Sequence, residues 1–171
     1  MGQRYAAESF SGTIPVKKSA ALCLLLVSIA APVWGADTVP YFASIKSDKI
    51  YMRLGPGDEY PIKWVYHRKG LPVEVLATYD AWRRVRDMDG ETGWIHTALL
   101  SRERTAVITG DKIAPIARTE DAGSRVVAEA KPGTVGRLRH CDLLACEVKF
   151  DGAEGWLPRA RLWGLKDGEH F

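Results

Sequence analysis

Cysteine and histidine are the residues of this chain whose side chains have the most specific chemistry. Cys141 and Cys146 lie five positions apart, and His140 directly precedes the first of them. Two thiols at this spacing can form a disulfide, take part in a redox reaction or bind zinc. A zinc ion needs four ligands, or three and a water molecule, and the sequence has no second pair at ligand spacing. A disulfide is therefore the favoured interpretation, with a redox or zinc site as the alternative.

No set of catalytic residues accompanies the cysteines. The sequence lacks a Gly-x-Ser-x-Gly elbow, a His-Glu-x-x-His motif and a phosphate-binding glycine-rich loop. Gly55-Pro56-Gly57 predicts a turn, because no Lys-Ser or Lys-Thr follows it. Apart from Cys23 near the N-terminus, no other thiol is available to act with a histidine. We therefore expect a non-enzymatic protein with no metal ion and no other cofactor.

The first 35 residues have the order of a secretory signal peptide. Lys17 and Lys18 precede an uncharged stretch over residues 19–36, in which small residues follow an apolar core. Val33 and Gly35 fit the −3 and −1 positions of a peptidase site, so we predict cleavage after Gly35. Export would place the protein in the periplasm or outside the cell, where disulfides persist. The alternative is an uncleaved membrane anchor, for which the uncharged stretch is short.

The composition is that of a globular protein with little net charge. The chain of 171 residues is 46% hydrophobic and 26% charged. Its formal net charge is +3, but removal of residues 1–35 leaves 21 basic and 20 acidic residues. A nearly neutral mature chain has no general attraction to nucleic acids or anionic membranes. We expect neither as a partner, apart from a membrane reached through an uncleaved leader.

Short strands separated by turns follow the leader. Alternating and β-branched residues predict strands over residues 41–45, 50–53, 62–66, 73–76, 82–86 and 93–96, followed by one helical turn over 97–100. Gly and Pro fix a loop over residues 54–61, and Asp89-Gly90 predicts a hairpin. No apolar period of 3.6 residues is long enough for a helix. The pattern indicates a small β-sandwich or barrel.

Four motifs of this stretch, in this order, resemble the bacterial SH3 (SH3b) domain. They are Met52-Arg53-Leu54-Gly55-Pro56-Gly57 with Tyr60-Pro61, Lys69-Gly70-Leu71-Pro72-Val73-Glu74-Val75, Trp82-Arg83-Arg84-Val85, and Gly93-Trp94-Ile95 with Leu99-Leu100. Tyr51 departs from the pattern, in which many members carry asparagine. The resemblance implies a small β-barrel and recognition of the cell envelope, often of peptidoglycan stem or bridge peptides.

A diverged second copy follows the first. At an offset of 63 residues, Lys49-Ile50 matches Lys112-Ile113, and at an offset of 62, Gly93-Trp94 matches Gly155-Trp156. The second copy lacks the Gly-Pro-Gly loop and a counterpart of Trp82. We therefore predict an all-β chain of two tandem, small SH3-like β-barrels: a signal peptide over 1–35, SH3-like module 1 over 36–103 and SH3-like module 2 over 104–171.

The repeat also places the two cysteines. Cys141 aligns with Thr78 and Cys146 with Arg83, two positions that flank the distal hairpin loop and face each other across it. A disulfide between them is predicted. Closing so short a loop contributes about 2 kcal/mol by the chain-entropy estimate. This is useful in a module of few residues with a thin core.

Ligand binding is expected mainly in module 1, which has the Gly-Pro-Gly loop and Trp82 that module 2 lacks. The ligand-binding candidates are Tyr51, Arg53, Tyr60, Trp82 and His96. The resemblance implies a cell-wall peptide or a similar envelope component as the ligand. The alternative function is a periplasmic adaptor that docks an envelope enzyme or sensor protein. The sequence leaves the oligomeric state open.

Several of these residues also have a structural interpretation. Arg53 could hold a loop carbonyl or the carboxylate of Asp58 instead of an anionic ligand. His96 could be an ordinary polar residue of a strand. Trp64 and Trp94 lie in strands close to glycine and are expected to be core residues.

The leader provides a first testable prediction. N-terminal sequencing of the exported protein should find Ala36 as the first residue. The segment before Lys17 is long and polar for a signal peptide and includes Glu8, so we hypothesise that translation starts at Val16. A chain shortened to begin at Val16 should then be exported as well as the full-length chain. Failure of its export would contradict this start.

Overall fold

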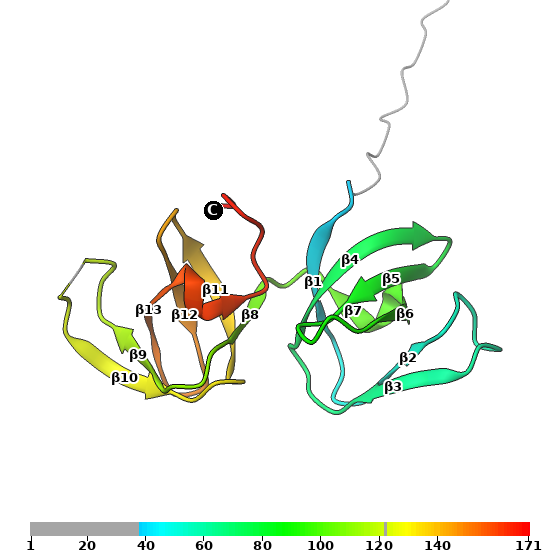
Figure 1. Ribbon diagram of the computed structural model, residues 1–171, viewed down its shortest axis with the longest axis horizontal. Coiled ribbons are helices and arrows are strands. Elements are labelled where there is room, and N and C mark those ends of the chain that lie inside the picture. The colour runs from blue at the N-terminus through cyan, green and yellow to red at the C-terminus, as the bar shows by residue number, and fades with distance from the viewer. Residues whose placement is uncertain (1–37, 122) are drawn as a thin grey trace, which may run out of the picture. The chain divides into compact units, whose positions relative to one another are not determined.

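The computed structural model describes residues 38–121 and 123–171, which form two antiparallel sheets of seven strands each (Figure 1). Strands β1–β7 make the sheet of module 1, and strands β8–β14 make the sheet of module 2. The predicted signal peptide, its cleavage site and the Val16 start lie outside the described residues. Within the described ranges, no helix is long and apolar enough to cross a membrane.

The strands of module 1 follow the order β3-β2-β6-β5-β4-β1-β7 in the sheet. Its elements are β1 (Tyr41–Ile45), β2 (Ile50–Arg53), β3 (Ile62–Tyr66), β4 (Pro72–Tyr79), β5 (Trp82–Arg86), β6 (Thr92–His96), the 3-10 turn η1 (Thr97–Leu99) and β7 (Leu100–Ser101). Every strand predicted for this module is present. β4 extends beyond the prediction to Tyr79, which pairs with Trp82 across a two-residue turn.

Module 2 repeats this order, strand for strand, as β10-β9-β13-β12-β11-β8-β14. Its elements are β8 (Thr105–Ile108), β9 (Ala114–Ala117), β10 (Val126–Ala130), β11 (Val135–Cys141), β12 (Ala145–Lys149), β13 (Glu154–Pro158), the 3-10 turn η2 (Arg159–Arg161) and β14 (Leu162–Trp163). The prediction of an all-β chain with two tandem, small SH3-like modules is confirmed.

The strand period of two places one face of module 1 in its core. In β2, Ile50 and Met52 are buried and Tyr51 between them is exposed. The buried cluster consists of Ala43, Ile45, Ile50, Met52, Val73, Val75, Val85 and Ile95. Removal of these apolar side chains from water is the main stabilising contribution. The opposite face of β4, β5 and β6 points outward.

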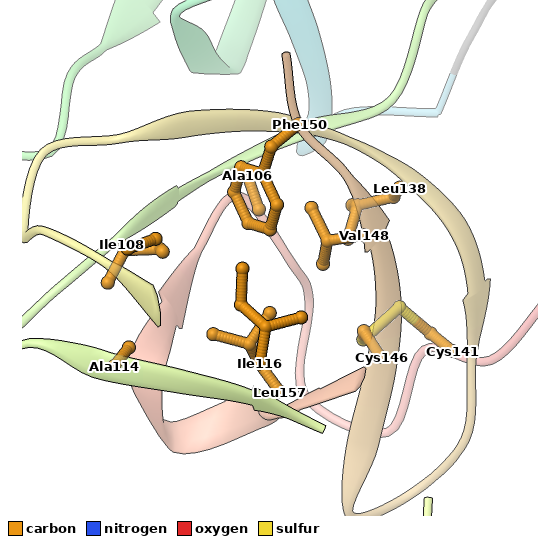
Figure 2. Close-up of a cluster of buried hydrophobic side chains, with 11 residues drawn as sticks. Ala106, Ile108, Ala114, Ile116, Leu138, Cys141, Cys146, Val148, Phe150 and Leu157 are labelled. Atoms are coloured by element: carbon orange, nitrogen blue, oxygen red, sulfur yellow. A yellow bond between two sulfur atoms is a disulfide. The ribbon is translucent and has the colours of Figure 1, made fainter. Parts of the chain in front are cut away.

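A disulfide lies within the core of module 2. Figure 2 shows Ile116, Val148 and Leu157 pointing into the same cluster, with Cys141 and Cys146 at its side. The two cysteines are bonded to each other and pair directly across the β11–β12 hairpin. The predicted disulfide is therefore confirmed. Besides closing a loop, the two cysteines fill part of the core of module 2.

A glycine in each module allows two strands to approach closely. A Cβ atom on Gly93 would lie 2.5 Å from Cγ of Met52 and 2.8 Å from the carbonyl oxygen of Arg53. A Cβ atom on Gly155 would lie 2.4 Å from the carbonyl oxygen of Ala117. No side chain fits at either position. Glycine therefore allows β6 to pair with β2 and β13 with β9, and the next residue of each strand points outward.

The connection before β9 is one residue longer than the sequence comparison predicted. That comparison matched Ile50 with Ile113, but Ile113 is 51% exposed, and Ala114 is the buried first residue of β9. β2 and β9, with the same burial pattern, are therefore related by an offset of 64 residues. The added residue lies in a turn, where it disturbs no pairing. As a result, Arg53 corresponds to Ala117.

The residues after β14 are bound to the disulfide hairpin. Phe171 and Cys141 exchange two backbone hydrogen bonds, of 2.9 and 3.1 Å. Arg159 donates a hydrogen bond to the carbonyl oxygen of Glu169, and Arg104 forms an ion pair with the carboxylate of the same residue. Two arginines therefore fix this segment against the hairpin.

Reduction of the disulfide should destabilise module 2. We expect the free energy of unfolding to fall by about 2 kcal/mol, because the reduced chain gains conformational freedom when unfolded. Urea unfolding with and without a reducing agent measures this difference. The variant Cys141→Ala/Cys146→Ala is the control, since its stability should not respond to the reducing agent. Identical unfolding curves for the oxidised and reduced natural protein would contradict the prediction.

Candidate functional site

The outward face of the module 1 sheet has a tryptophan between two arginines. Trp94 on β6 pairs with Arg53 on β2 and, on its other side, with Arg84 on β5. Residues that pair across an antiparallel ladder point to the same face. Trp94 is half-buried, whereas Arg84 is exposed. The indole therefore lies between two arginine positions on this face.

Aromatic rings continue from this tryptophan onto the neighbouring strands. The rings of Trp82 and His96 meet edge to face, with their centroids 5.3 Å apart. Tyr79 meets Trp94 in the same way, with the centroids 6.4 Å apart, and its side chain is 61% exposed. We call these four residues, Tyr79, Trp82, Trp94 and His96, the aromatic face.

The imidazole of His96 is held in a defined orientation. Its Nδ1 accepts a hydrogen bond of 3.2 Å from the backbone N–H of Ala98, which caps η1. A neutral imidazole that accepts at Nδ1 carries its proton on Nε2. Nε2–H of His96 therefore adds a hydrogen-bond donor to the aromatic face, beside the indole N–H groups of Trp82 and Trp94 and the hydroxyl of Tyr79.

Arg53 holds the loop over residues 54–61. Its Nη1 donates to the carbonyl oxygen of Tyr60 at 2.8 Å, and its Nη2 lies 3.3 Å from Oδ1 of Asp58. These contacts confirm the structural interpretation of Arg53. The Tyr60 ring covers Gly55, where a Cβ atom would lie 2.3 Å from it. Arg53 and Tyr60 thus fix the loop, and a ligand-binding role for either stays a prediction.

The remaining predicted residues lie at different places. Tyr51 is two positions before Arg53 on the same face of β2, and Nζ of Lys49 lies 5.6 Å from the centroid of its ring. The prediction that Trp64 is a core residue is wrong, because its side chain is 49% exposed. Trp64 belongs to β3, an edge strand with a neighbour on one side only. Trp94 is also outside the core, since it follows Gly93 on the outward face.

Module 2 keeps the tryptophan and loses the rest of the aromatic face. Trp156 corresponds to Trp94, because each follows the glycine of the close strand pairing. The positions of Tyr79, Trp82 and His96 are taken by Asp142, Ala145 and Pro158. Equivalent backbone hydrogen bonds support this correspondence, since the first residue of each 3-10 turn donates to the distal hairpin in both modules. Among the described residues of module 2, Trp156 and the adjacent His140 are the rings at this surface, whereas module 1 presents four.

The site has residues that the sequence interpretation missed. The sequence interpretation expects Trp94 in the core, and neither Tyr79 nor Arg84 is among its ligand-binding candidates. A two-residue turn over residues 80–81 would have placed Tyr79 opposite Trp82 on the same face of the sheet, and so in the site. The period of two after the buried Gly93 was a second signal, because it directs Trp94 outward.

The chemistry available at this surface is that of binding. Exposed rings pack against apolar groups, and guanidinium groups form charge-assisted hydrogen bonds with carboxylates. Over residues 38–121 and 123–171, no three His, Cys, Asp or Glu side chains gather in a way that could hold a metal ion.

Comparison with known proteins gives a distant structural similarity and one family. The chain is similar to the solved structure of NlpC1 from Trichomonas vaginalis, with 12% sequence identity over 80% of this chain and 50% of that chain and a TM-score of 0.34. This chain thus spans half the length of NlpC1, and so low a TM-score supports no argument about function. No curated protein matches the sequence.

The family match covers both modules. The model of the bacterial SH3 domain matches residues 46–102 and again residues 111–164. Each match contains one close strand pairing at glycine and the tryptophan that follows it. With two matches that together span more than half of the sequence, the chain belongs to the bacterial SH3 domain family.

Proposed function

We propose that this chain is a non-enzymatic, exported protein that binds a cell-envelope ligand, a peptidoglycan peptide or a similar component, mainly through module 1. The observation that carries this proposal is the aromatic face, which lies beside two arginines in module 1 and has no counterpart in module 2. Membership in the bacterial SH3 domain family supports a binding role.

The chemistry of the face suits a short peptide with free carboxylates. Peptidoglycan stem peptides combine small apolar side chains with such groups. The exposed Tyr79 and the ring of Trp82 offer an apolar surface to the small side chains of such a peptide. Arg84 offers a guanidinium group to the carboxylates of the peptide, and among the described residues it forms no ion pair.

Two observations support export. The leader has the order of a signal peptide. The disulfide of module 2 is the kind of bond that persists in oxidising compartments and is rare in the cytosol. Together they favour the periplasm or the cell exterior as the location of the protein.

Removal of two rings of the aromatic face should strongly weaken binding to the cell wall. In a pull-down with purified peptidoglycan, Tyr79→Ala/Trp82→Ala should be retained at least about tenfold less than the natural protein, because buried aromatic anchors supply most of the affinity at binding surfaces. Arg84→Gln should weaken retention without abolishing it.

The control removes two apolar side chains from a surface that the proposal does not use. Val126→Ala/Val127→Ala changes exposed residues of β10 in module 2 and should leave retention unchanged. Thermal unfolding would verify that all variants are folded. Equal retention of the natural protein and Tyr79→Ala/Trp82→Ala would refute the proposal.

A protein adaptor is the second candidate, and the edge strand β3 favours it. Ile62, Trp64 and Val65 are all exposed on this strand, although each is apolar. β3 has a hydrogen-bonded neighbour only in β2, so its other edge has backbone groups to which an extended segment of a partner could add. The ligand would then be an envelope enzyme or sensor protein.

Lysine substitutions on the edge strand β3 distinguish docking of a partner protein from binding of peptidoglycan. Ile62→Lys/Val65→Lys should prevent a partner strand from adding to β3, since lysine on an edge opposes pairing. The variant should lose proteins captured from an envelope extract freed of wall material, while its retention on peptidoglycan stays unchanged. If Tyr79→Ala/Trp82→Ala rather than the β3 variant loses the captured proteins, β3 is not the docking strand.

A further inference from the structure

Module 2 has an apolar groove at the position of the aromatic face of module 1. It is a hollow of about 300 Å³ between the loop after β9, the β11–β12 hairpin and strand β13. Its lining residues are Ala117, Thr119, Glu120, Asp121, Leu144, Ala145, Trp156, Leu157 and Pro158. Leu144 is 82% exposed, so the apolar wall of the groove is open to an incoming ligand.

The charge at this groove is entirely negative. Glu120 and Asp121 are its only charged lining residues, and Asp142 adjoins Glu120 from the hairpin. Among the described residues, no ion pair joins any of these three carboxylates to a basic side chain. The ring of His140 meets that of Trp156 beside the groove, with the centroids 5.7 Å apart. Arg159 also lies nearby, but its Nη1 donates to the backbone carbonyl oxygens of Asp142 and Glu169.

The charged residues of this surface differ between the modules. Arg53 corresponds to Ala117, which opens the groove and removes a cation from it. The cross-strand neighbour of the tryptophan is Arg84 in module 1 and Glu147 in module 2. The same scaffold therefore presents a positive aromatic surface in one module and a negative apolar groove in the other.

Among the described residues, the carboxylates at the groove form no ion pair. The Asp142 carboxylate accepts hydrogen bonds of 2.7 Å from the backbone N–H groups of Leu144 and Ala145, and these bonds lower its pKa. A hydrogen bond with Asp142, partial desolvation and the negative charges of Asp142 and Asp121 raise the pKa of Glu120. A bound cation would relieve this repulsion.

We propose that this groove is a second binding site of the protein and that it takes a basic side chain, lysine or arginine, of a peptide segment. The alkyl stem of such a side chain would pack on Trp156 and Leu144, and its ammonium or guanidinium group would reach Glu120 and Asp121. Long basic side chains combine the apolar and the charged parts that the groove requires. The site goes beyond the envelope-binding role of module 1 and does not depend on it.

Calorimetric titration of the mature protein with a short peptide tests this proposal. The probe is an acetylated, amidated alanine peptide with two lysines, and its partner carries norleucine in place of both. The natural protein should bind the lysine peptide at least about tenfold more tightly than the norleucine peptide, since one charge-assisted contact is worth about 1.5 kcal/mol or more.

Matched variants locate the site. Glu120→Gln/Asp121→Asn should weaken binding of the lysine peptide at least about tenfold. Glu129→Gln/Asp151→Asn removes the same charge from exposed positions outside the groove and should leave the affinity unchanged. Trp82→Ala in module 1 should also leave it unchanged, so failure of the envelope proposal and failure of this one are distinguishable.

Three results would overturn the proposal. One is equal binding of the lysine and norleucine peptides, and another is an equal loss of affinity in both acidic double variants. The third is a dimer, seen by sedimentation, that Glu120→Gln/Asp121→Asn dissociates. In that case the occupant is a second copy of this chain, whose module 1 is basic at its aromatic face.

Discussion

The close approach of two backbones at glycine is the constraint on which both modules depend. At Gly93 and at Gly155 a side chain would collide with the strand alongside, so only glycine allows the sheet to continue past this point. The pairing fixes the orientation of the residue that follows. Because side chains alternate, that residue must point outward, and in both modules it is a tryptophan. One steric requirement of the core thus sets the centre of both candidate binding surfaces.

Around this common centre the two modules have diverged in how they hold the adjacent loop. In module 1 an arginine side chain spans the loop, since Arg53 contacts both Asp58 and the carbonyl of Tyr60. In module 2 the loop is closed by small residues, with Thr119 donating to the hydroxyl of Ser124 through its backbone and side chain. The short side chains leave space that the arginine would fill. Alanine at the position of Arg53 thus leaves room at the groove that we propose as a second binding site.

Local sequence signals predicted most of the strands and the disulfide. The Asp89-Gly90 turn, the alternation in β2 and the pairing of Cys141 with Cys146 depend on near neighbours in the chain, and the structure has all of them. The fold class followed from the regular spacing of these signals. The repeat was also detectable, although it diverged strongly.

What could not be predicted depends on the arrangement of distant segments. Trp64 looked like a core residue because apolar strands are usually covered, but its strand has become an edge, which no local pattern reveals. The extra residue before Ala114 was hidden because Lys-Ile occurs at both places, although Ile50 begins β2 and Ile113 precedes β9. The groove of module 2 could not be predicted, because it depends on how close the loop after β9 lies to the β11–β12 hairpin. Such proximity of charges is a property of the folded chain alone.

The segment after β14 has a consequence for the chemistry of the disulfide. Both sulfur-bearing residues are almost fully buried, and Phe171 adds its backbone to Cys141 along the exposed side of the hairpin. A thiolate must reach a sulfur atom to exchange with the bond. Because the cysteines are buried, we expect reduction to require a local opening of module 2. The contacts of Arg104 and Arg159 with Glu169 hold the segment after β14 and so oppose its detachment, although neither arginine takes part in the disulfide.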